Sequence, residues 1–353
     1  MTQPVVIRAL VALVWVLLGL SATAFSPPSL GDGDPAGRRY GSLDLAAMND
    51  APTVSDSVRS VAAIAVDGAN GHVLASRNAD ARLAPASLTK MMTALVAVKH
   101  ASSLTDIVTA TERSLSEPST IGLDPGDRLT LEDMLYGLLL PSGNDAALAI
   151  AESVGRGSID TFVGWMNEQA AVMGLKNTHF ANPNGLDQSG HYSSARDMAA
   201  IGRSLLAEPA LAKIVSTPTH TVPGPPLYFF RNSNPLLGAP TIDGIKTGFT
   251  DDAGRCFAAS ATRDGRRVVA VVLNSPNIGS DAQVLLDAEF AASRTAALEI
   301  ARPGFSDVRV DRAVTPGKVT AVLAGWEAPL LRGYQAQGQT DVYLASSSLG
   351  RWQ

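Results

Sequence analysis

The spacing of apolar and polar residues changes several times along this chain of 353 residues, and each change marks a new group of expected elements. Strand-like runs at 61–66 and 72–76 flank Asp67-Gly68-Ala69-Asn70-Gly71, which predicts a β-hairpin. The pattern over 85–100 is helical and has few polar positions, so we expect a helix that is buried on most sides. The folded body is thus expected to begin with two strands and a buried helix.

The middle of the chain, 104–216, is mainly helical in pattern. Thr130-Leu131-Glu132-Asp133 resembles a capping box at a helix start, and the apolar run that follows it stops at Pro141-Ser142-Gly143. Helical spacing resumes at Asp145. Two helices are therefore expected to flank a tight turn.

Strand patterns return in the last third of the chain, at 242–247, 256–262 and 267–273, and the spacing over 280–298 predicts a closing amphipathic helix. The order is strands, helices, strands and a final helix. This order predicts an α/β (α+β) fold in which helices cover a sheet and the middle helices form an insertion.

The N-terminal part of the chain does not share these patterns. Arg8, an apolar run at 9–20 and Ala22-Thr23-Ala24 are the parts of a secretory signal peptide, which we place at 1–24. The alternative is an uncleaved N-terminal anchor, although the run is short for a membrane span of ~20 residues. Residues 25–57 are rich in Pro, Gly, Asp and Ser and predict a flexible linker. Both interpretations place the rest of the chain outside the cytoplasm, in the periplasm or cell envelope or secreted.

The folded body is expected at 58–302, and the C-terminal residues 303–353 are expected to form a short β-like tail. This tail contains two strand-like pieces, 307–310 and 318–323, among Gly and Pro. No anchor pattern is recognised in it, so peripheral association with the membrane or the cell wall stays open.

Composition narrows the classes of function. Hydrophobic residues make up 46% of the chain and charged residues 17%, as in ordinary globular proteins. The formal net charge is -5 and no block of Lys and Arg stands out, so we expect no nucleic-acid partner.

Cysteine and histidine usage points away from disulfides and metals. The single Cys256 lies in an apolar strand-like run and is expected to be buried and structural. The five histidines lack the spacing of zinc ligands, so we expect no metal and no other cofactor. Each histidine is expected in a turn or on the surface, and His191 is the one that could approach a substrate channel.

Ser87-Leu88-Thr89-Lys90, at the start of the buried helix, is the first candidate for chemistry. Positions three apart share a helix face, so Ser87 and Lys90 can form a hydrogen bond. A serine hydroxyl needs a base at neutral pH, and Lys90 supplies one only when neutral, a state that burial and a second cation favour. Backbone N–H groups of the first turn also favour developing negative charge beside Ser87. On its own, this spacing is common by chance.

Two later motifs make the pattern specific. Ser142-Gly143-Asn144 and Lys246-Thr247-Gly248 follow in the order of the set S-x-x-K, S-x-N and K-T-G, which marks active-site-serine β-lactamases and penicillin-binding proteins. From about Ser60 to Arg302 the chain resembles the low-molecular-mass penicillin-binding proteins, specifically the D-alanyl-D-alanine carboxypeptidases of peptidase family S11. Further likeness lies in the stretches 83–93, 180–187, 191–198 and 243–250.

The resemblance implies a β-lactamase/transpeptidase-like fold, with an antiparallel sheet flanked by helices, and an acyl-enzyme mechanism. It implies that Ser87 attacks the terminal D-Ala-D-Ala bond of a peptidoglycan stem peptide, that Lys90 is the general base and that Ser142 relays a proton to the leaving D-alanine. Substrate-binding roles are implied for Asn144, Lys246, Thr247, Gly248 and Phe249. The backbone N–H groups of Ser87 and Phe249 are the expected oxyanion hole, and β-lactam antibiotics are expected to inhibit the enzyme covalently.

The same motifs leave other functions open. A class A β-lactamase needs a glutamate on the loop after S-x-N, and 176–190 contains none. A sensor or scaffold that binds β-lactams without hydrolysis is normally fused to a signalling or membrane module, which we do not recognise in the sequence. A transpeptidase or endopeptidase of the same fold stays open, because the choice of acceptor depends on the shape of the groove.

Overall fold

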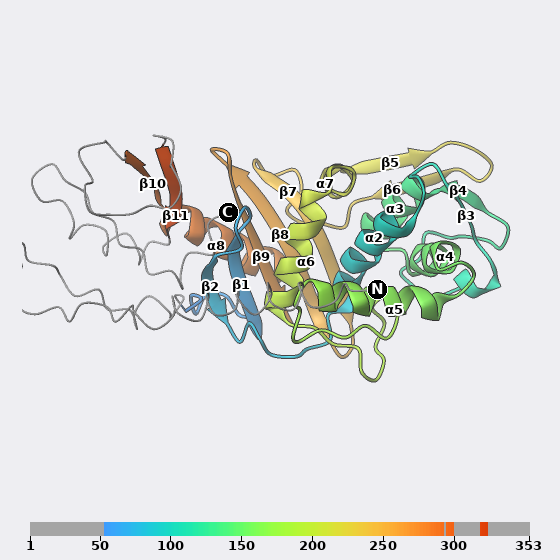
Figure 1. Ribbon diagram of the computed structural model, residues 1–353, viewed down its shortest axis with the longest axis horizontal. Coiled ribbons are helices and arrows are strands. Elements are labelled where there is room, and N and C mark those ends of the chain that lie inside the picture. Colours follow the sequence, from blue (N-terminus) through green and yellow to red (C-terminus); the bar gives the residue numbers. More distant parts are fainter. Residues whose placement is uncertain (1–52, 293, 300–317, 324–353) are drawn as a thin grey trace, which may run out of the picture. The chain divides into compact units, whose positions relative to one another are not determined.

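The computed structural model describes residues 53–292, 294–299 and 318–323 (Figure 1). A five-stranded antiparallel sheet with the strand order β2-β1-β9-β8-β7 lies at its centre. Its strands are β1 (Ala62–Asp67), β2 (Val73–Arg77), β7 (Ile242–Thr250), β8 (Gly254–Arg263) and β9 (Arg266–Leu273). The predicted hairpin and the three later strands are confirmed, and β1 pairs with β9 so that the two ends of the body meet in one sheet.

Two hydrophobic cores lie on opposite faces of this sheet. Successive strand residues point to opposite faces, so Ile64 of β1 and Val271 of β9 enter one core while Ala63 and Val272 enter the other. Helix α6 (Ala195–Ala207) packs on the first face, and α8 (Ile278–Ala292) packs on the second. Because both faces are covered, the three inner strands β1, β8 and β9 are mostly apolar runs rather than alternating ones.

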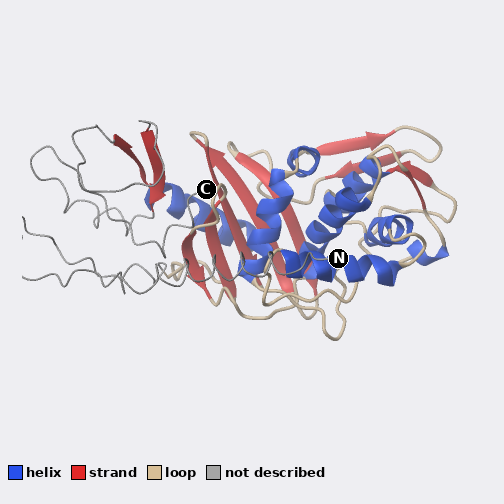
Figure 2. Cartoon of the chain, viewed as in Figure 1, coloured by secondary structure: helices blue, strands red, loops and turns tan. Residues whose placement is uncertain are grey.

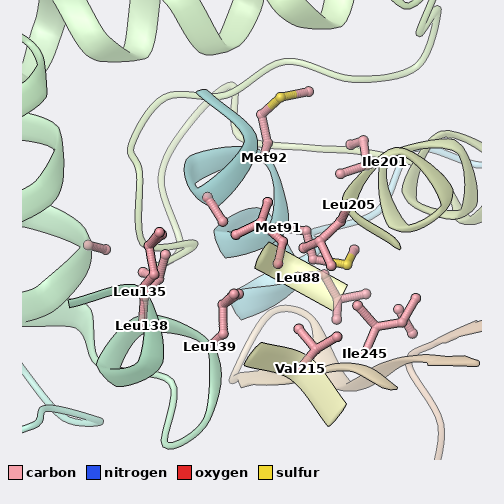
Figure 3. Close-up of a cluster of buried hydrophobic side chains, with 14 of the residues drawn as sticks. Leu88, Met91, Met92, Leu135, Leu138, Leu139, Ile201, Leu205, Val215 and Ile245 are labelled. Carbon is pink, nitrogen blue, oxygen red and sulfur yellow. The ribbon is translucent and has the colours of Figure 1, made fainter. Parts of the chain in front are cut away.

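The remaining helices pack together beside α6 (Figure 2). They are α2 (Thr89–His100), α3 (Leu131–Leu139), α4 (Asn144–Val154), α5 (Ile159–Val172) and α7 (Pro209–Ser216). Figure 3 shows the core between them and the sheet, to which α2 contributes Met91, α3 Leu139, α6 Leu205 and β7 Ile245. Helix α2 is thus buried on most sides, as its sequence pattern predicts.

The region expected to be mainly helical contains more irregular and strand structure than predicted. A hairpin of β3 (Ile107–Thr109) and β4 (Arg128–Thr130), with a turn of 3-10 helix at η2 (Glu112–Ser114), precedes α3. No helix lies between Val172 and Ala195. A further hairpin, β5 (Thr219–Val222) with β6 (Tyr228–Arg231), was not predicted.

Thr130 forms half of the expected capping box. Its Oγ1 accepts a hydrogen bond from Asp133 N at 3.1 Å and donates one to Asp133 Oδ2 at 2.7 Å. The Asp133 carboxylate therefore accepts its hydrogen bond from the Thr130 hydroxyl that caps the helix. Helix α3 is still capped at its N-terminus.

The closing helix is shorter than predicted. The pattern over 280–298 predicted one helix, but α8 ends at Ala292 and Arg294–Glu299 forms strand β10, paired with β11 (Lys318–Leu323). The Thr, Ala and Leu of β10 suit either structure locally, and pairing with a segment distant in sequence favours the strand. The strand-like piece at 318–323 is confirmed. The signal peptide, most of the linker and the piece at 307–310 lie outside the described residues.

Two other features of the described part bear on the expectations. Cys256 is fully buried in β8, as predicted, and burial raises the pKa of its thiol to about 11. Within the described ranges, none of the helices combines the length and hydropathy of a membrane-spanning segment.

Candidate active site

Ser87 lies in a turn of 3-10 helix, η1 (Ala86–Leu88), that leads into α2. Two glycines from distant segments enclose this turn. A Cβ atom on Gly248 of β7 would lie 2.9 Å from Ser87 N, and a Cβ atom on Gly185 would lie 3.0 Å from the same atom. Only glycine permits such close backbone approach, so these two residues set the position of the turn.

Lys90 is fully buried behind Ser87. Its Nζ lies 2.8 Å from Ser87 Oγ, 2.7 Å from Asn144 Oδ1 and 2.6 Å from the carbonyl oxygen of Asn184. Burial, and secondly the charge of Lys246, hold the pKa of Lys90 well below its usual value. A neutral amine has two hydrogens for the amide and carbonyl oxygens, which only accept, and one lone pair for the Ser87 hydroxyl.

Lys246 brings a second amine to the site from β7. It is 1% exposed, and its Nζ donates to the carbonyl oxygen of Thr247 at 2.8 Å. Burial lowers the pKa of Lys246 to about 7. Because two buried cations repel each other, the site disfavours the state in which Lys90 and Lys246 are both protonated.

The S-x-N segment forms the expected turn between α3 and α4. Ser142 has a φ of 74°, in the left-handed region that non-glycine residues rarely adopt. Asn144 begins α4, and its side chain joins two segments: Oδ1 accepts from Lys90, and Nδ2 donates to the carbonyl oxygen of Glu117 at 2.9 Å. The turn therefore places Ser142 and Asn144 beside Ser87.

Asp145 is a site-forming residue that the sequence analysis missed. Its carboxylate is 2% exposed and accepts from the backbone N–H groups of Ile121, Gly122 and Leu123 at 2.9, 3.0 and 3.1 Å. These bonds hold the segment before β4 against the S-x-N turn. An acidic residue beside a motif, in a helix of apolar residues, is the signal that could have revealed it.

A cavity of about 570 Å³ opens over Ser87, within the usual range for small-ligand sites. The predicted residues that line it are Ser87, Ser142, Asn144, Thr247, Gly248 and Phe249. Lys90 and Lys246 lie buried behind this wall. The structure thus brings all the predicted site residues together around one cavity.

The cavity also has lining residues that were not predicted. Ser233 Oγ lies 2.7 Å from Thr247 Oγ1, which forms a pair of hydroxyls at the K-T-G strand. The exposed Arg255 lies on β8, with its guanidinium carbon 5.8 Å from the centre of the Phe249 ring. Both residues lie far in sequence from the S-x-x-K motif, and no local pattern marks them.

The expectation that every histidine lies in a turn or on the surface is wrong for His191. It is 7% exposed, and its ring lies between α2 and the segment that carries Asn184. The burial arises because two polar partners satisfy both ring nitrogens. Among the described residues, no group of three His, Cys, Asp or Glu side chains is placed to hold a metal ion.

A serine with a buried lysine as its neighbour, facing an S-x-N turn and a K-T-G strand, defines the class of active-site-serine acyl-transfer enzymes. The fold agrees with this class. It matches the crystal structure of a D-alanyl-D-alanine carboxypeptidase from Mycobacterium tuberculosis H37Rv with a TM-score of 0.64 and 34% sequence identity, over 68% of this chain and 94% of that chain.

Within that class, the family model of the D-alanyl-D-alanine carboxypeptidases, peptidase S11, matches residues 47–277. The chain belongs to this family of hydrolases. It is 35% identical over 288 residues to the D-alanyl-D-alanine carboxypeptidase DacF of Bacillus subtilis (strain 168), across 79% of this chain and 70% of that protein. It is 42% identical over 224 residues to DacA of Escherichia coli (strain K12), across 60% of this chain and 55% of that protein.

Proposed function

We propose that this chain is an exported serine-type D-Ala-D-Ala carboxypeptidase of the cell envelope. It removes the terminal D-alanine from peptidoglycan stem peptides, which trims the peptides and limits their cross-linking. The hydrogen bond between Lys90 Nζ and Ser87 Oγ carries the proposal. It supports a neutral lysine as the base that turns this serine into a nucleophile.

Acylation proceeds through four of the predicted groups. Ser87 Oγ attacks the carbonyl carbon of the penultimate D-alanine while its proton passes to Lys90 Nζ. The backbone N–H groups of Ser87 and Phe249 bind the oxyanion of the tetrahedral intermediate. Ser142 then passes its proton to the leaving nitrogen and takes the proton held by Lys90 Nζ, so that the C–N bond breaks, D-alanine departs and Lys90 is neutral again.

Deacylation uses the same base. A water molecule gives a proton to Lys90 as its oxygen attacks the ester carbonyl, and the second tetrahedral intermediate expels Ser87 Oγ, which regains its proton.

Substrate binding follows from the cavity wall. Strand β7 is an edge strand of the sheet, so an extended peptide can add to it, and Gly248 lets that peptide approach closely. The hydroxyls of Thr247 and Ser233 face the terminal carboxylate, and Lys246 keeps this wall electropositive. Asn144 Nδ2 has a second hydrogen for the substrate amide beside the one that bonds Glu117.

A class A β-lactamase is disfavoured by the loop that follows the S-x-N motif. Its acidic residue Asp187 accepts from Thr250 Oγ1 at 2.6 Å and from Asp252 N at 3.2 Å. A carboxylate bound in this way serves to attach the loop to β7, and it is poorly placed to activate a water molecule. Covalent inhibition by β-lactams, rather than their rapid hydrolysis, is part of the proposal.

The experiment is release of D-alanine by the purified full chain from a peptide ending in D-Ala-D-Ala. Ser87→Ala is expected to abolish release, and mass spectrometry is expected to locate labelled penicillin on Ser87. D-alanine release by Ser87→Ala at the wild-type rate, or penicillin on another residue, would contradict the proposal. Addition of a peptide that carries a free amine measures transfer of the acyl group to an acceptor. If the cross-linked peptide were the main product, the protein would be a transpeptidase and not a carboxypeptidase.

A further inference from the structure

The segment 181–191, which we call the cover loop, lies against the N-terminal turns of α2. Lys90 Nζ donates to the carbonyl oxygen of Asn184 at 2.6 Å, and Thr93 Oγ1 donates to the carbonyl oxygen of Pro183 at 2.5 Å. Both acceptors are backbone atoms. Their positions therefore depend on how the cover loop as a whole is held against the helix.

His191 joins the two ends of the cover loop to α2. Its Nδ1 accepts from Ala181 N at 3.0 Å, and its Nε2 lies 2.8 Å from Thr89 Oγ1. Because Nδ1 accepts from an N–H group, the neutral ring has its hydrogen on Nε2 and donates it to Thr89. His191 is 7% exposed and Thr89 fully buried, so water has little access to replace these bonds.

We infer that His191 is a positioning residue for the reaction proposed above: its neutral imidazole ties the cover loop to α2 and thereby keeps the Asn184 carbonyl on Lys90 Nζ. This inference rests on the proposed role of Lys90 as base. When the tie breaks, the carbonyl withdraws from Nζ, and the lone pair of the amine is no longer directed at the Ser87 hydroxyl.

The protonation state of His191 controls this tie, because an imidazolium has no acceptor for the backbone N–H group. The groups that face the ring are the Thr89 hydroxyl of α2, the Phe180 ring at 5.9 Å, and the side chains of His179 and Asp187. Burial lowers the pKa of His191 to about 4; His179 lowers it too, and Asp187 opposes the shift. The tie is thus intact at neutral pH and opens as the pH falls through about 4.

Two mild substitutions break the same bond from opposite sides. Thr89→Val removes the acceptor with little change of shape, whereas His191→Asn keeps an acceptor near Ala181 N but cannot reach Thr89. We expect each to lower the rate of acylation by penicillin about tenfold, and the double variant to lose no more than either alone. His191→Ala removes both bonds and is expected to lose about 10²-fold.

His100→Asn is the control. His100 lies at the other end of α2 from Thr89, where its ring stacks on Trp165 with the ring centres 4.1 Å apart. We expect this variant to acylate at the wild-type rate, which would show that loss of a histidine that packs at α2 does not by itself slow the reaction.

The assay measures the rate of attachment of labelled penicillin per labelled site, so that misfolded molecules are not counted. A purely structural role lowers the number of labelled sites but not the rate per site, and that result would overturn the inference. Wild-type rates in Thr89→Val and His191→Ala, or additive losses in the double variant, would overturn it as well. Absence of label in the wild-type chain would instead contradict the proposed function.

Hydrogen exchange supplies a readout that does not depend on the reaction. The Ala181 amide of the wild type is expected to lose protection as the pH falls through about 4, whereas His191→Asn, which has no ring to protonate, should keep it. Unchanged protection of the wild-type amide across that pH would show that the imidazole does not control the loop.

Discussion

Replacing Gly185 by alanine perturbs the position of Ser87 without removing any polar group of the site. The new Cβ atom would lie 2.5 Å from the carbonyl carbon of Ala86 and 3.0 Å from Ser87 N. Carbon atoms in contact ordinarily lie about 3.5 Å apart, so the cover loop and the η1 turn must separate by about 1 Å. Misplacing a reacting group by ~1 Å costs about 10² in rate, and we expect acylation of Gly185→Ala to slow by about that factor.

A matched control separates this collision from backbone strain. Gly185 has a φ of 88°, which alanine adopts only at a cost of about 1–2 kcal/mol. Gly190, in the same loop, has a φ of 81°, and the atom nearest to an added Cβ there is His179 Nδ1 at 3.8 Å. Gly190→Ala therefore has the same strain without the collision.

The assay is again the rate of labelled-penicillin attachment per labelled site, together with thermal unfolding of both variants. We expect similar losses of Tm in the two variants and a slow reaction in Gly185→Ala alone. If both variants acylate at the same rate, close packing of Gly185 does not set the position of Ser87, and the reasoning fails.

Other predictions test the remaining parts of the site and core. Lys246→Gln removes a cation that lowers the pKa of Lys90, so the acid limb of the rate of acylation against pH should move to higher pH; a limb that stays in place would show that Lys246 does not act on the base. Asp145→Asn leaves one side-chain oxygen for several backbone N–H groups and should lower the free energy of unfolding by about 1–3 kcal/mol. Denaturant titration measures this loss, and an unchanged midpoint would contradict it. Leu286→Ala opens the core on the α8 face and should lower the free energy of unfolding by about 2–5 kcal/mol. The rate of penicillin attachment per labelled site should not change, and a slower rate would contradict the separation of the two cores.

The sequence predicts the residues of the three motifs and misses most of the residues that hold those motifs in place. Ser87, Lys90 and the two later motifs could be found because each role requires a particular residue type at a fixed spacing. Asn184 supplies a carbonyl oxygen, which every residue has, so no pattern marks it. One partner of His191, Thr89, lies on a helix about a hundred positions earlier in the chain, which explains why the burial of His191 was not predicted.

Secondary structure was predicted best where local pattern and tertiary packing agree. The central strands are apolar on both faces, and α2 is apolar nearly all round, so local sequence already determines their environment. The segment Arg294–Glu299 has no such bias, and its pairing with Lys318–Leu323 overrode the expected helix. The β5–β6 hairpin escaped prediction because its strands are short and flank a proline-rich turn.

The two-faced sheet also bears on how such an enzyme can change over evolutionary time. The residues that we propose as catalytic gather on the α6 side and at the edge of β7, whereas α8 reaches the cavity only through its first residues, Ile278 and Gly279. The remainder of α8 packs against the opposite face, so substitutions there alter stability while the spacing of Ser87, Lys90 and Ser142 is preserved. The sheet thus separates most of α8 from Ser87. Substitutions on the α8 face, or new contacts made there, can accumulate without a change in the position of Ser87.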